Sequence, residues 1–348
     1  MSSTKPLKWG IIGCGGIAHR RTIPGIAKSQ GSVLGYVMDL NPDLCKTVGE
    51  EYGVSYSSNI EDVINSDVDV VYIATPVFCH KEQVIMAAKA KKHILLEKPM
   101  GLTCQEAEEI INVCKENNVK LAVGFMMRYH AHHQQIKELL QSGKIGDIVS
   151  MRAQFTCWYP DMPGVWRQNK AKSGGGAVMD MATHCIDLLQ YLTGAQAEEV
   201  FAMCSTQTFN YEVDDSASIM MKMKGGAHAY IDANFNIPDD ATEGKLEFYG
   251  TKGSIIATGT LAQEEVGTTK VTLAKTGQGY DASQARGELK SYELPASDGN
   301  LYTKEIESFA DSIINDSPVI ISGEEALYVQ RICESAYASS DSGTKIKL

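Results

Sequence analysis

The sequence feature that most constrains the fold is a regular alternation of short apolar runs with helical segments in the first part of the chain. Helical spacing extends over Lys81–Lys91 and Cys104–Asn117, and Thr103 and Glu106 form a T-x-x-E capping box at the start of the second segment. Strands that are apolar throughout and alternate with helices predict a parallel sheet covered on both faces. The apolar runs lie at Leu7–Ile12, Val33–Met38, Val68–Ala74, His93–Leu96 and Val119–Val123, and a weaker, shorter strand candidate at Val54–Ser57 comes third in order. We therefore predict an α/β chain that begins with a doubly wound parallel sheet.

From about residue 147 the alternation of strands and helices ends. A long helix is expected over residues 176–192, and strands separated by short turns follow it. Strands joined in this way indicate antiparallel pairing, so we predict an α+β C-terminal domain with a large open, mainly antiparallel sheet. The expected strands are Ser216–Met223, Ala227–Phe235, Lys245–Tyr249 and Lys270–Ala274. The segment from Tyr302 to Ala338 is expected to form two helices with a break near residues 316–318.

Length and composition narrow the class of protein further. A chain of 348 residues suits two domains, here predicted as residues 1–127 and 128–348 with the C-terminal helix packing back on the first. The 32 Lys and Arg against 43 Asp and Glu give a net charge of −11, which disfavours nucleic acid or an anionic membrane as partner. The nine cysteines form no C-x-x-C pair, and no apolar run is long enough to cross a membrane. We expect a cytoplasmic protein with free thiols.

A glycine turn follows the first predicted strand. Gly13 permits a tight turn, Gly15 lets the backbone approach a pyrophosphate, and the small Ala18 allows close packing of helix on strand. Asp39 ends the second strand, where a carboxylate can accept hydrogen bonds from ribose hydroxyls, and residues 40–43 include no Arg or Lys to pair with a 2′-phosphate. The pattern predicts a Rossmann-type domain that binds NAD rather than NADP. The residues expected to hold the cofactor here are Gly13, Gly15, Gly16, Ile17, Ala18 and Asp39.

Lys98 is a candidate for chemistry because it follows a predicted parallel strand. Ligands of open parallel sheets lie beyond the carboxyl ends of the strands, so Lys98 is expected near the reactive end of the cofactor. Pro99 restricts the backbone that carries it. A lysine there can stabilise a developing alkoxide or take part in proton transfer. The plain alternative is a solvated lysine at the end of a strand.

The helix after the glycines of 174–176 carries a second group of candidates. Asp180, His184, Asp187 and Tyr191 fall on one stripe at helical spacing, while the positions between them form an apolar stripe that can face a sheet. A histidine between two acids is typical of a site with a general base and is unusual on an ordinary exposed helix face. A solvated polar face is the alternative.

The ordered motifs GIIGCGGIA, IATP, EKP, GFMMRY, WR and SGGGAVMDMATH together resemble the Gfo/Idh/MocA family of NAD(P)-dependent oxidoreductases over nearly the whole chain. The resemblance implies that Lys98, Asp180 and His184 are the catalytic group, with lysine and histidine handling the proton and aspartate orienting the substrate hydroxyl. It also implies a second domain whose open sheet makes dimers or tetramers. Further residues that it implies for the cofactor or the cleft are Thr75, Pro76, His80, Glu97, Lys98, Arg128, Trp166 and Arg167. Many members carry Asn shortly after the Thr-Pro, and its absence here leaves the local cofactor contacts open.

Two aromatic segments have open interpretations. His130, His132 and His133 form a trio without an acid at ligand spacing, so we expect no metal and predict a solvated loop or helix start. The loop that contains Trp158 and Tyr159 can stack rings on the apolar face of a sugar, which makes Tyr159 a candidate substrate residue. Anchoring of the loop in the core by one of its tryptophans is the alternative.

The favoured function is reversible hydride transfer between NAD and a secondary alcohol of a sugar, polyol or glycoside. In this hypothesis His184 takes the hydroxyl proton, Lys98 stabilises the oxygen and Asp180 fixes the geometry. Two alternatives remain: cleavage of a glycoside through transient oxidation, and an NAD-binding sensor without chemistry. The expected partners are a small-molecule substrate and further copies of the chain.

Overall fold

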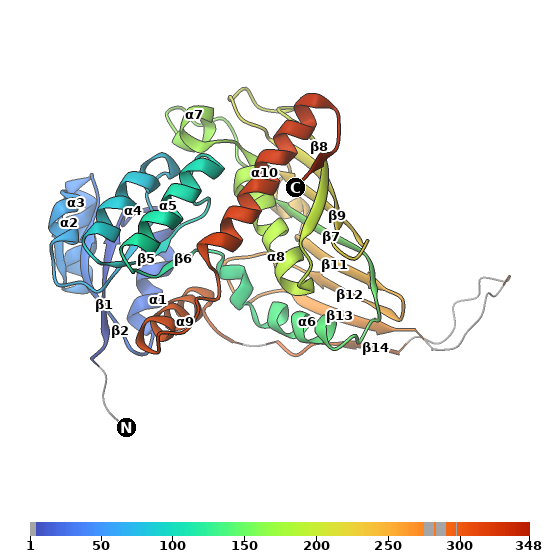
Figure 1. Cartoon of the computed structure of the whole chain (residues 1–348), viewed down its shortest axis with the longest axis horizontal. Coiled ribbons are helices and arrows are strands. Elements are labelled where there is room, and N and C mark those ends of the chain that lie inside the picture. Colours follow the sequence, from blue (N-terminus) through green and yellow to red (C-terminus); the bar gives the residue numbers. More distant parts are fainter. Residues whose placement is uncertain (1–4, 275–281, 283–289, 297) are drawn as a thin grey trace. The chain divides into compact units, whose positions relative to one another are not determined.

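The computed structural model describes residues 5–274, 282, 290–296 and 298–348, which divide into two compact units (Figure 1). The first unit comprises Met1–Met126, Ala171–Gly174 and Gly299–Gln330. The second comprises Met127–Lys170, Gly175–Asp298 and Arg331–Leu348. Helix α10 (Gly323–Ser342) therefore contributes its first turns to one unit and the remainder to the other.

The first unit is built on a six-stranded parallel sheet in the order β3-β2-β1-β4-β5-β6. This is the doubly wound order, in which the strand sequence reverses between β1 and β4. The strands are β1 (Leu7–Ile12), β2 (Ser32–Met38), β3 (Ser55–Ser57), β4 (Val70–Ile73), β5 (His93–Leu96) and β6 (Leu121–Val123). The helices are α1 (Ile23–Lys28), α2 (Pro42–Tyr52), α3 (Ile60–Ile64), α4 (His80–Lys89), α5 (Cys104–Glu116) and α9 (Leu301–Ile314). All six predicted strands are confirmed.

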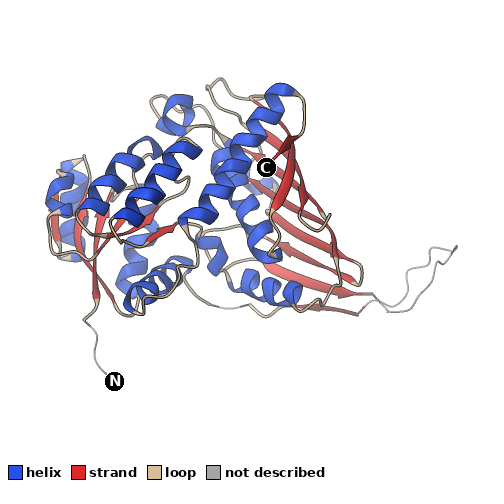
Figure 2. Ribbon diagram, viewed as in Figure 1, coloured by secondary structure: helices blue, strands red, loops and turns tan. Residues whose placement is uncertain are grey.

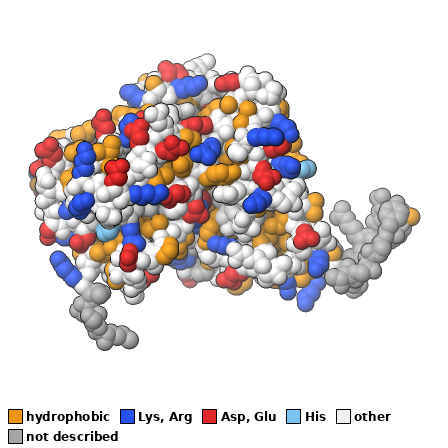
Figure 3. All heavy atoms as spheres, viewed as in Figure 1, with side chains coloured by type: hydrophobic (Ala, Val, Ile, Leu, Met, Phe, Trp, Pro, Cys, Tyr) orange, Lys and Arg blue, Asp and Glu red, His pale blue; other side chains and the backbone are white. Residues whose placement is uncertain are grey.

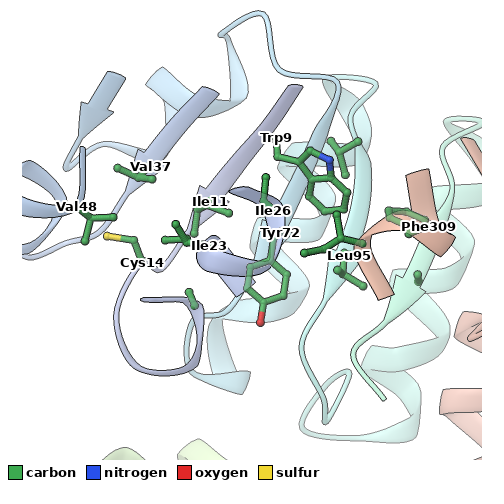
Figure 4. Close-up of a cluster of buried hydrophobic side chains, with 14 of the residues drawn as sticks. Trp9, Ile11, Cys14, Ile23, Ile26, Val37, Val48, Tyr72, Leu95 and Phe309 are labelled. Carbon is green, nitrogen blue, oxygen red and sulfur yellow. The ribbon is translucent and has the colours of Figure 1, made fainter. Parts of the chain in front are cut away.

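A buried apolar cluster holds this sheet to its helices (Figure 4). Trp9 on β1 and Leu95 on β5 lie beside Phe309 of α9, and the rings of Trp9 and Phe309 meet edge to face with centroids 6.1 Å apart. Burying each such side chain contributes roughly 1.5–3 kcal/mol. Helix α9, which begins 178 residues after the end of β6, is thus part of the first core.

Side chains at the helix starts fix where α2 and α5 begin. Asn41 accepts hydrogen bonds from the amides of Asp43 and Leu44 at 3.1 and 3.2 Å. Thr103 accepts one from the amide of Glu106 at 3.1 Å, as the capping box predicts. The Glu106 carboxylate reaches back to the amide of Leu102 at 2.9 Å, one residue before the position that the motif specifies.

The second unit is built on a nine-stranded sheet in the order β14-β13-β12-β11-β7-β10-β9-β8-β15 (Figure 2). Every neighbouring pair is antiparallel except β7 and β10, which run parallel. The strands are β7 (Ile148–Thr156), β8 (Ala197–Ser205), β9 (Ser216–Met223), β10 (His228–Asn234), β11 (Lys245–Gly250), β12 (Gly253–Thr258), β13 (Thr268–Leu273), β14 (Lys290–Glu293) and β15 (Ile346–Lys347). The predicted open, mainly antiparallel sheet is confirmed.

Helix α8 (Thr183–Thr193) covers one face of this sheet, and α6 (Ala131–Gln141) packs beside α8 (Figure 1). Burial alternates along β9, where Ile219 and Met221 point to the covered face and Met220 and Lys222 are exposed. Lys, Arg, Asp and Glu side chains of both signs are mixed over the face drawn in Figure 3. In the described part of the chain, no helix is both long enough and apolar enough to span a bilayer.

Candidate functional site

The turn after β1 has backbone geometry that requires glycine. Gly13 has φ of 87°, and a Cβ there would lie 3.0 Å from both the carbonyl carbon of Ala74 and Cγ2 of Thr75. Gly16 has φ of 49°, and a Cβ there would meet nothing within 4 Å. The turn thus packs tightly against the end of β4 on one side and is open at Gly16.

Asp39 lies beside this turn. A Cβ on Gly15 would be 3.9 Å from Oδ2 of Asp39, while Oδ1 accepts a hydrogen bond from the amide of Asn41 at 3.0 Å. Burial, followed by the charge of Asp39, raises the pKa of the Cys14 thiol to about 12. Cys14 is therefore a neutral packing residue inside the turn, and the anionic group here is Asp39.

The helix that leaves the turn begins irregularly. Residues Ala18–Thr22 form a π-helical turn, and α1 continues from Ile23. Ala18 is fully buried, as the small residue of a dinucleotide turn should be. Ile17 directly precedes the π turn and has helical backbone angles. Such π turns are rare and recur at functional sites.

His80, at the start of α4, joins the loops that follow β4 and β5. Its Nε2 lies 2.9 Å from the carbonyl oxygen of Thr75, and its Nδ1 lies 3.1 Å from that of Pro99. Burial lowers the pKa of this imidazole to about 4, so it is neutral and donates to one carbonyl at a time. His80 thereby holds the segment that carries Thr75 and Pro76 against the segment that carries Lys98.

Glu97 is oriented by groups from neighbouring strands. The hydroxyl of Tyr72 donates to Oε1 of Glu97 at 2.5 Å, and the amide of Lys98 donates to Oε2 at 3.2 Å. A Cβ on Gly124 would lie 3.3 Å from this carboxyl group. Lys98 follows directly, with a half-buried side chain and a cis peptide bond to Pro99. Lys98 thus starts from a backbone held by Tyr72, Glu97 and His80.

In the second unit, Asp180 lies on a π-helical turn, Val178–Ala182, that leads directly into α8. Its Oδ2 is 3.6 Å from Nε of Arg167, and the Arg167 guanidinium lies 4.7 Å from the centre of the Trp166 ring. The structure therefore brings Trp166, Arg167 and Asp180 together.

His184 is one turn further along the same helix. Its side chain is 4% exposed, and its ring meets that of Phe155 on β7 edge to face, with centroids 6.1 Å apart. Asp180 and His184 are thus carried by one rigid element that packs on the central strand of the sheet.

Arg128 and Asp187 form a buried ion pair within the second unit. Nη2 of Arg128 is 2.6 Å from Oδ1 of Asp187, and its Nε is 3.0 Å from Oδ2. The guanidinium also lies 4.6 Å from the centre of the Tyr191 ring. Asp187 on the predicted polar stripe of α8 is therefore buried and paired with Arg128, so the stripe is not solvated at this position. A contact of Arg128 with the cofactor stays a prediction.

The histidine trio is buried, so the prediction that it is solvated is wrong. His130 accepts a hydrogen bond from the amide of His132 at the start of α6, which confirms the predicted helix start. His133 lies 2.7 Å from the carbonyl oxygen of Met127 and 3.1 Å from the hydroxyl of Thr260. The two ring nitrogens of His133 therefore have hydrogen-bond partners, which offsets the cost of burying this imidazole. Among the described residues, no group of three or more His, Cys, Asp or Glu is arranged to hold a metal ion.

The loop after β7 places its two aromatic residues differently. Trp158 is 43% exposed and meets Phe209 edge to face at 5.2 Å between centroids. Tyr159 is half-buried, 5.0 Å from the Phe235 ring, and its amide donates to the Phe235 carbonyl oxygen at 2.8 Å. Tyr159 therefore anchors the loop, and Trp158 is the more exposed of the two residues.

No sequence motif predicts a role for four further residues that lie near these candidates. Tyr72 and Glu305 in the first unit both interact with Glu97, Tyr72 through a hydrogen bond and Glu305 through the charge of the Glu97 carboxylate. Asp214 and Tyr337 in the second unit are hydrogen-bonded to each other across 123 residues of sequence. The only local signal is the pair of adjacent acids, Asp214 and Asp215, before the apolar strand β9.

Comparisons with known proteins agree with this architecture. Residues 7–125 match a family model described as "Oxidoreductase family, NAD-binding Rossmann fold", and residues 133–256 match the "GFO/IDH/MocA C-terminal domain". Oxidoreductase P35 of Formosa agariphila is 32% identical over 72% of this chain and 78% of its own length. The 1,5-anhydro-D-fructose reductase of Ensifer adhaerens is 28% identical over 92% of each chain.

Among solved structures, a levoglucosan dehydrogenase in complex with NADH and levoglucosan superposes with a TM-score of 0.86 at 25% identity, covering 98% of this chain and 99% of that one. Each unit is matched in part by its own family model, and the relatives share most of their length with this chain. The chain therefore belongs to the GFO/IDH/MocA family and is an oxidoreductase with an NAD-binding Rossmann domain.

Proposed function

We propose that the protein transfers a hydride reversibly between NAD and a secondary alcohol of a sugar, polyol or glycoside. The observation that carries this proposal is the glycine turn with Asp39 beside Gly15, because it fits a dinucleotide. The substrate class is supported by the relatives, which include a 1,5-anhydro-D-fructose reductase and a levoglucosan dehydrogenase.

The fit of the cofactor follows from the turn. The open side at Gly16 leaves space for a pyrophosphate at the helix start, and the Asp39 carboxylate can accept hydrogen bonds from ribose hydroxyls. The same carboxylate would repel a 2′-phosphate, which favours NAD over NADP. When bound, NAD supplies a ring carbon that accepts the hydride. The residues proposed to hold it are Gly13, Gly15, Gly16, Ile17, Ala18, Asp39, Thr75, Pro76, His80, Glu97, Lys98, Arg128, Trp166 and Arg167.

The proton chemistry belongs to Lys98, Asp180 and His184 in this proposal. His184 accepts the proton of the substrate hydroxyl as the carbon–hydrogen bond breaks, and the ammonium of Lys98 stabilises the oxygen as negative charge develops. Asp180 orients both the hydroxyl and the imidazole. Tyr159 is proposed to contact the sugar ring. The near-complete burial of His184 supports this role, because a dry site strengthens each of these interactions.

We also propose that the protein assembles with further copies of itself through the exposed face of the nine-stranded sheet. Large apolar side chains stand on that face: Phe201 is 37% exposed, Met203 66% and Met220 50%. Monomeric proteins seldom leave such residues side by side in solvent. The nine free cysteines support a reducing, cytoplasmic compartment.

NADH fluorescence during incubation with a panel of sugars, inositols and glycosides tests the redox proposal. We expect one class to produce NADH in proportion to oxidised product, with NAD preferred to NADP at equal concentration. Product formation without accumulation of NADH would replace the proposal with cofactor-recycling cleavage of a glycoside. Tight NAD binding without turnover of any alcohol or ketone would instead favour the sensor alternative.

A further inference from the structure

We propose that Asp214 is a positioning residue: held by Tyr337, it sets the place of the helix that carries Asp180 and His184. This inference rests on the proposed roles of those two residues. Asp214 lies between β8 and β9 and is 8% exposed, so it reaches the helix from a segment more than thirty residues later in the chain.

Three consecutive amides at the start of this helix donate to Asp214. Gly176 donates to Oδ1 at 2.7 Å, Val178 donates to Oδ2 at 2.9 Å, and Ala177 donates to the backbone oxygen at 2.9 Å. The first amides of a helix have no partner within the helix, and they carry partial positive charge. One residue therefore satisfies three of these groups and places a carboxylate against the positive end of the helix.

Tyr337 on α10 completes the contact. Its hydroxyl donates to Oδ1 of Asp214 at 2.6 Å and accepts from the amide of Gly176 at 3.2 Å. Burial, followed by the charge of Asp214, raises the pKa of Tyr337 well above its ordinary value, so the phenol keeps its proton. Tyr337 thus contacts both the Asp214 carboxylate and the helix start that this carboxylate holds.

The glycines before the helix are explained by this approach. A Cβ on Gly176 would lie 2.0 Å from the backbone oxygen of Asp214, and a Cβ on Gly175 would lie 2.0 Å from the hydroxyl of Tyr337. Any side chain at 176 would push the helix start away from Asp214, because the obstacle is backbone. These two glycines therefore serve the close contact with Asp214 and Tyr337.

The contact matters for chemistry because the next turns of the helix carry the proposed catalytic residues. The amide of Asp180 donates to the carbonyl oxygen of Gly176 at 3.0 Å. Gly176, whose amide binds Asp214, therefore also starts the helical turn that carries Asp180. His184 is reached by one further turn and packs on Phe155 of β7. A displacement of about 1 Å at a catalytic group can cost about a hundredfold in turnover. A loose helix start would shift Asp180 and His184 together.

The test compares Asp214→Asn with Asp215→Asn. Asp215 is a matched control, because it is fully buried and its carboxylate accepts three backbone amides where that of Asp214 accepts two. The three are those of Gln207, Thr208 and Phe209 at 2.8–3.0 Å, which belong to a loop before β9. Both variants lose one carboxylate and should lose comparable thermal stability. We expect kcat to fall about a hundredfold in Asp214→Asn and to stay within about twofold in Asp215→Asn. The Kd for NAD should be unchanged in both.

Tyr337→Phe is the second variant, since it keeps the Asp214 carboxylate and removes only the hydroxyl that holds it. We expect kcat to fall in this variant too, by less than in Asp214→Asn, again with an unchanged Kd for NAD. Wild-type kcat in a folded Asp214→Asn would overturn the inference. If that variant does not fold, wild-type kcat in Tyr337→Phe would overturn it.

A readout independent of turnover separates this inference from the proposed function. In protein labelled with ¹⁵N-histidine, the imidazole signal of His184, assigned with His184→Gln, should move in Asp214→Asn and stay in place in Asp215→Asn. An unmoved signal in Asp214→Asn rejects positioning by Asp214 even if the wild type oxidises sugars. A wild type that oxidises no alcohol rejects the proposed function, and the His184 signal then still decides the role of Asp214.

Discussion

At the scale of single residues, the first unit holds a carboxyl group that its surroundings keep neutral. Glu305 on α9 is 2% exposed, and within the described part of the chain its Oε1 has no hydrogen-bond partner. Burial, followed by the charge of Glu97, raises the pKa of Glu305 well above its ordinary value of 4.5. A second buried charge next to Glu97 would be costly, so the proton stays on Glu305.

Glu305→Gln should therefore change how stability depends on pH. The folded protein keeps the Glu305 proton at pH values where the unfolded chain, above about 4.5, has released it. The free energy of unfolding thus falls as pH rises through this window, by at most about 1.4 kcal/mol per pH unit. Glutamine removes that loss, so the variant should gain stability relative to wild type between pH 5 and pH 7 in urea denaturation. Glu116→Gln, exposed on α5, should follow the wild type, and an unchanged pH dependence in Glu305→Gln would mean that Glu305 ionises.

Lys98→Met tests the proposed catalytic lysine. Removing the ammonium removes charge stabilisation at the substrate oxygen, so kcat should fall by at least about a hundredfold. The Kd for NAD, measured by fluorescence, should change little, because the glycine turn and Asp39 remain. Lys89→Met, at the exposed end of α4, is the matched control and should keep full activity. A kcat within threefold of wild type in Lys98→Met would remove Lys98 from the mechanism.

At the scale of elements, the helix that carries Asp180 and His184 is fixed along its length. Asp214 holds its start, Phe155 packs against His184, and Arg128 holds Asp187 in its middle. The Arg128 and Asp187 side chains are 3% and 1% exposed, so neither charge has water as an alternative partner. This pair is therefore expected to be needed for α8 to dock against the 127–130 segment.

Arg128→Met should destabilise the protein by about 3–5 kcal/mol, because it leaves the Asp187 charge buried without its partner. The double variant Arg128→Met/Asp187→Leu should recover much of this loss, since it removes both charges. Urea denaturation of the two single variants and the double variant measures the coupling. Lys46→Met, which breaks the exposed pair with Glu50, should cost less than about 1 kcal/mol. A similarly small loss in Arg128→Met would show that the pair is not needed for stability.

Elements with a strong local signal were predictable from the sequence, and those that depend on distant partners were not. Apart from β3, which is Ser-Tyr-Ser, the strands of the first sheet are short and apolar, and the turn at Gly13 has a steric requirement that the residue types reveal. Strand β7 lies at the centre of the second sheet, yet it mixes residues such as Arg152 with apolar ones, because one face of that sheet is exposed. The β7–β10 pairing is the parallel one within a sheet that the short turns predicted to be mainly antiparallel.

The residues of the candidate site also fall into those that a local motif reveals and those that depend on distant partners. Motif residues such as Lys98 and His184 stand out by type and spacing, whereas the residues that hold them do so through contacts distant in sequence. Asp214 and Tyr337 are 123 residues apart, and their hydrogen bond depends on the docking of α10 in the second unit. Burial of the His130 ring was equally hidden, because its acceptor, the carbonyl oxygen of Val266, lies 136 residues away.

At the scale of the whole molecule, we expect copies of the chain to associate through the exposed face of the nine-stranded sheet. The register places Phe201 of β8 opposite Met220 of β9, and Met220 opposite Tyr230 of β10, so these side chains form one row across three strands. Arg152 and Glu247 continue the row on β7 and β11. A two-fold axis brings the same surface of two copies together, so this row can be buried against the same row of a second copy.

A charge in the middle of this row should break the assembly. Light scattering should give the wild type a multiple of the 37.9 kDa chain mass, and Met220→Glu should shift it toward 37.9 kDa, because paired copies would bury two new carboxylates. Val33→Glu is the matched control: Val33 is 43% exposed on β2 of the other sheet, so this variant should keep the wild-type mass. Circular dichroism establishes that both variants fold. A wild type that runs at 37.9 kDa, or an oligomer that survives Met220→Glu, would exclude this face as the interface, and the exposed apolar row would then need another partner.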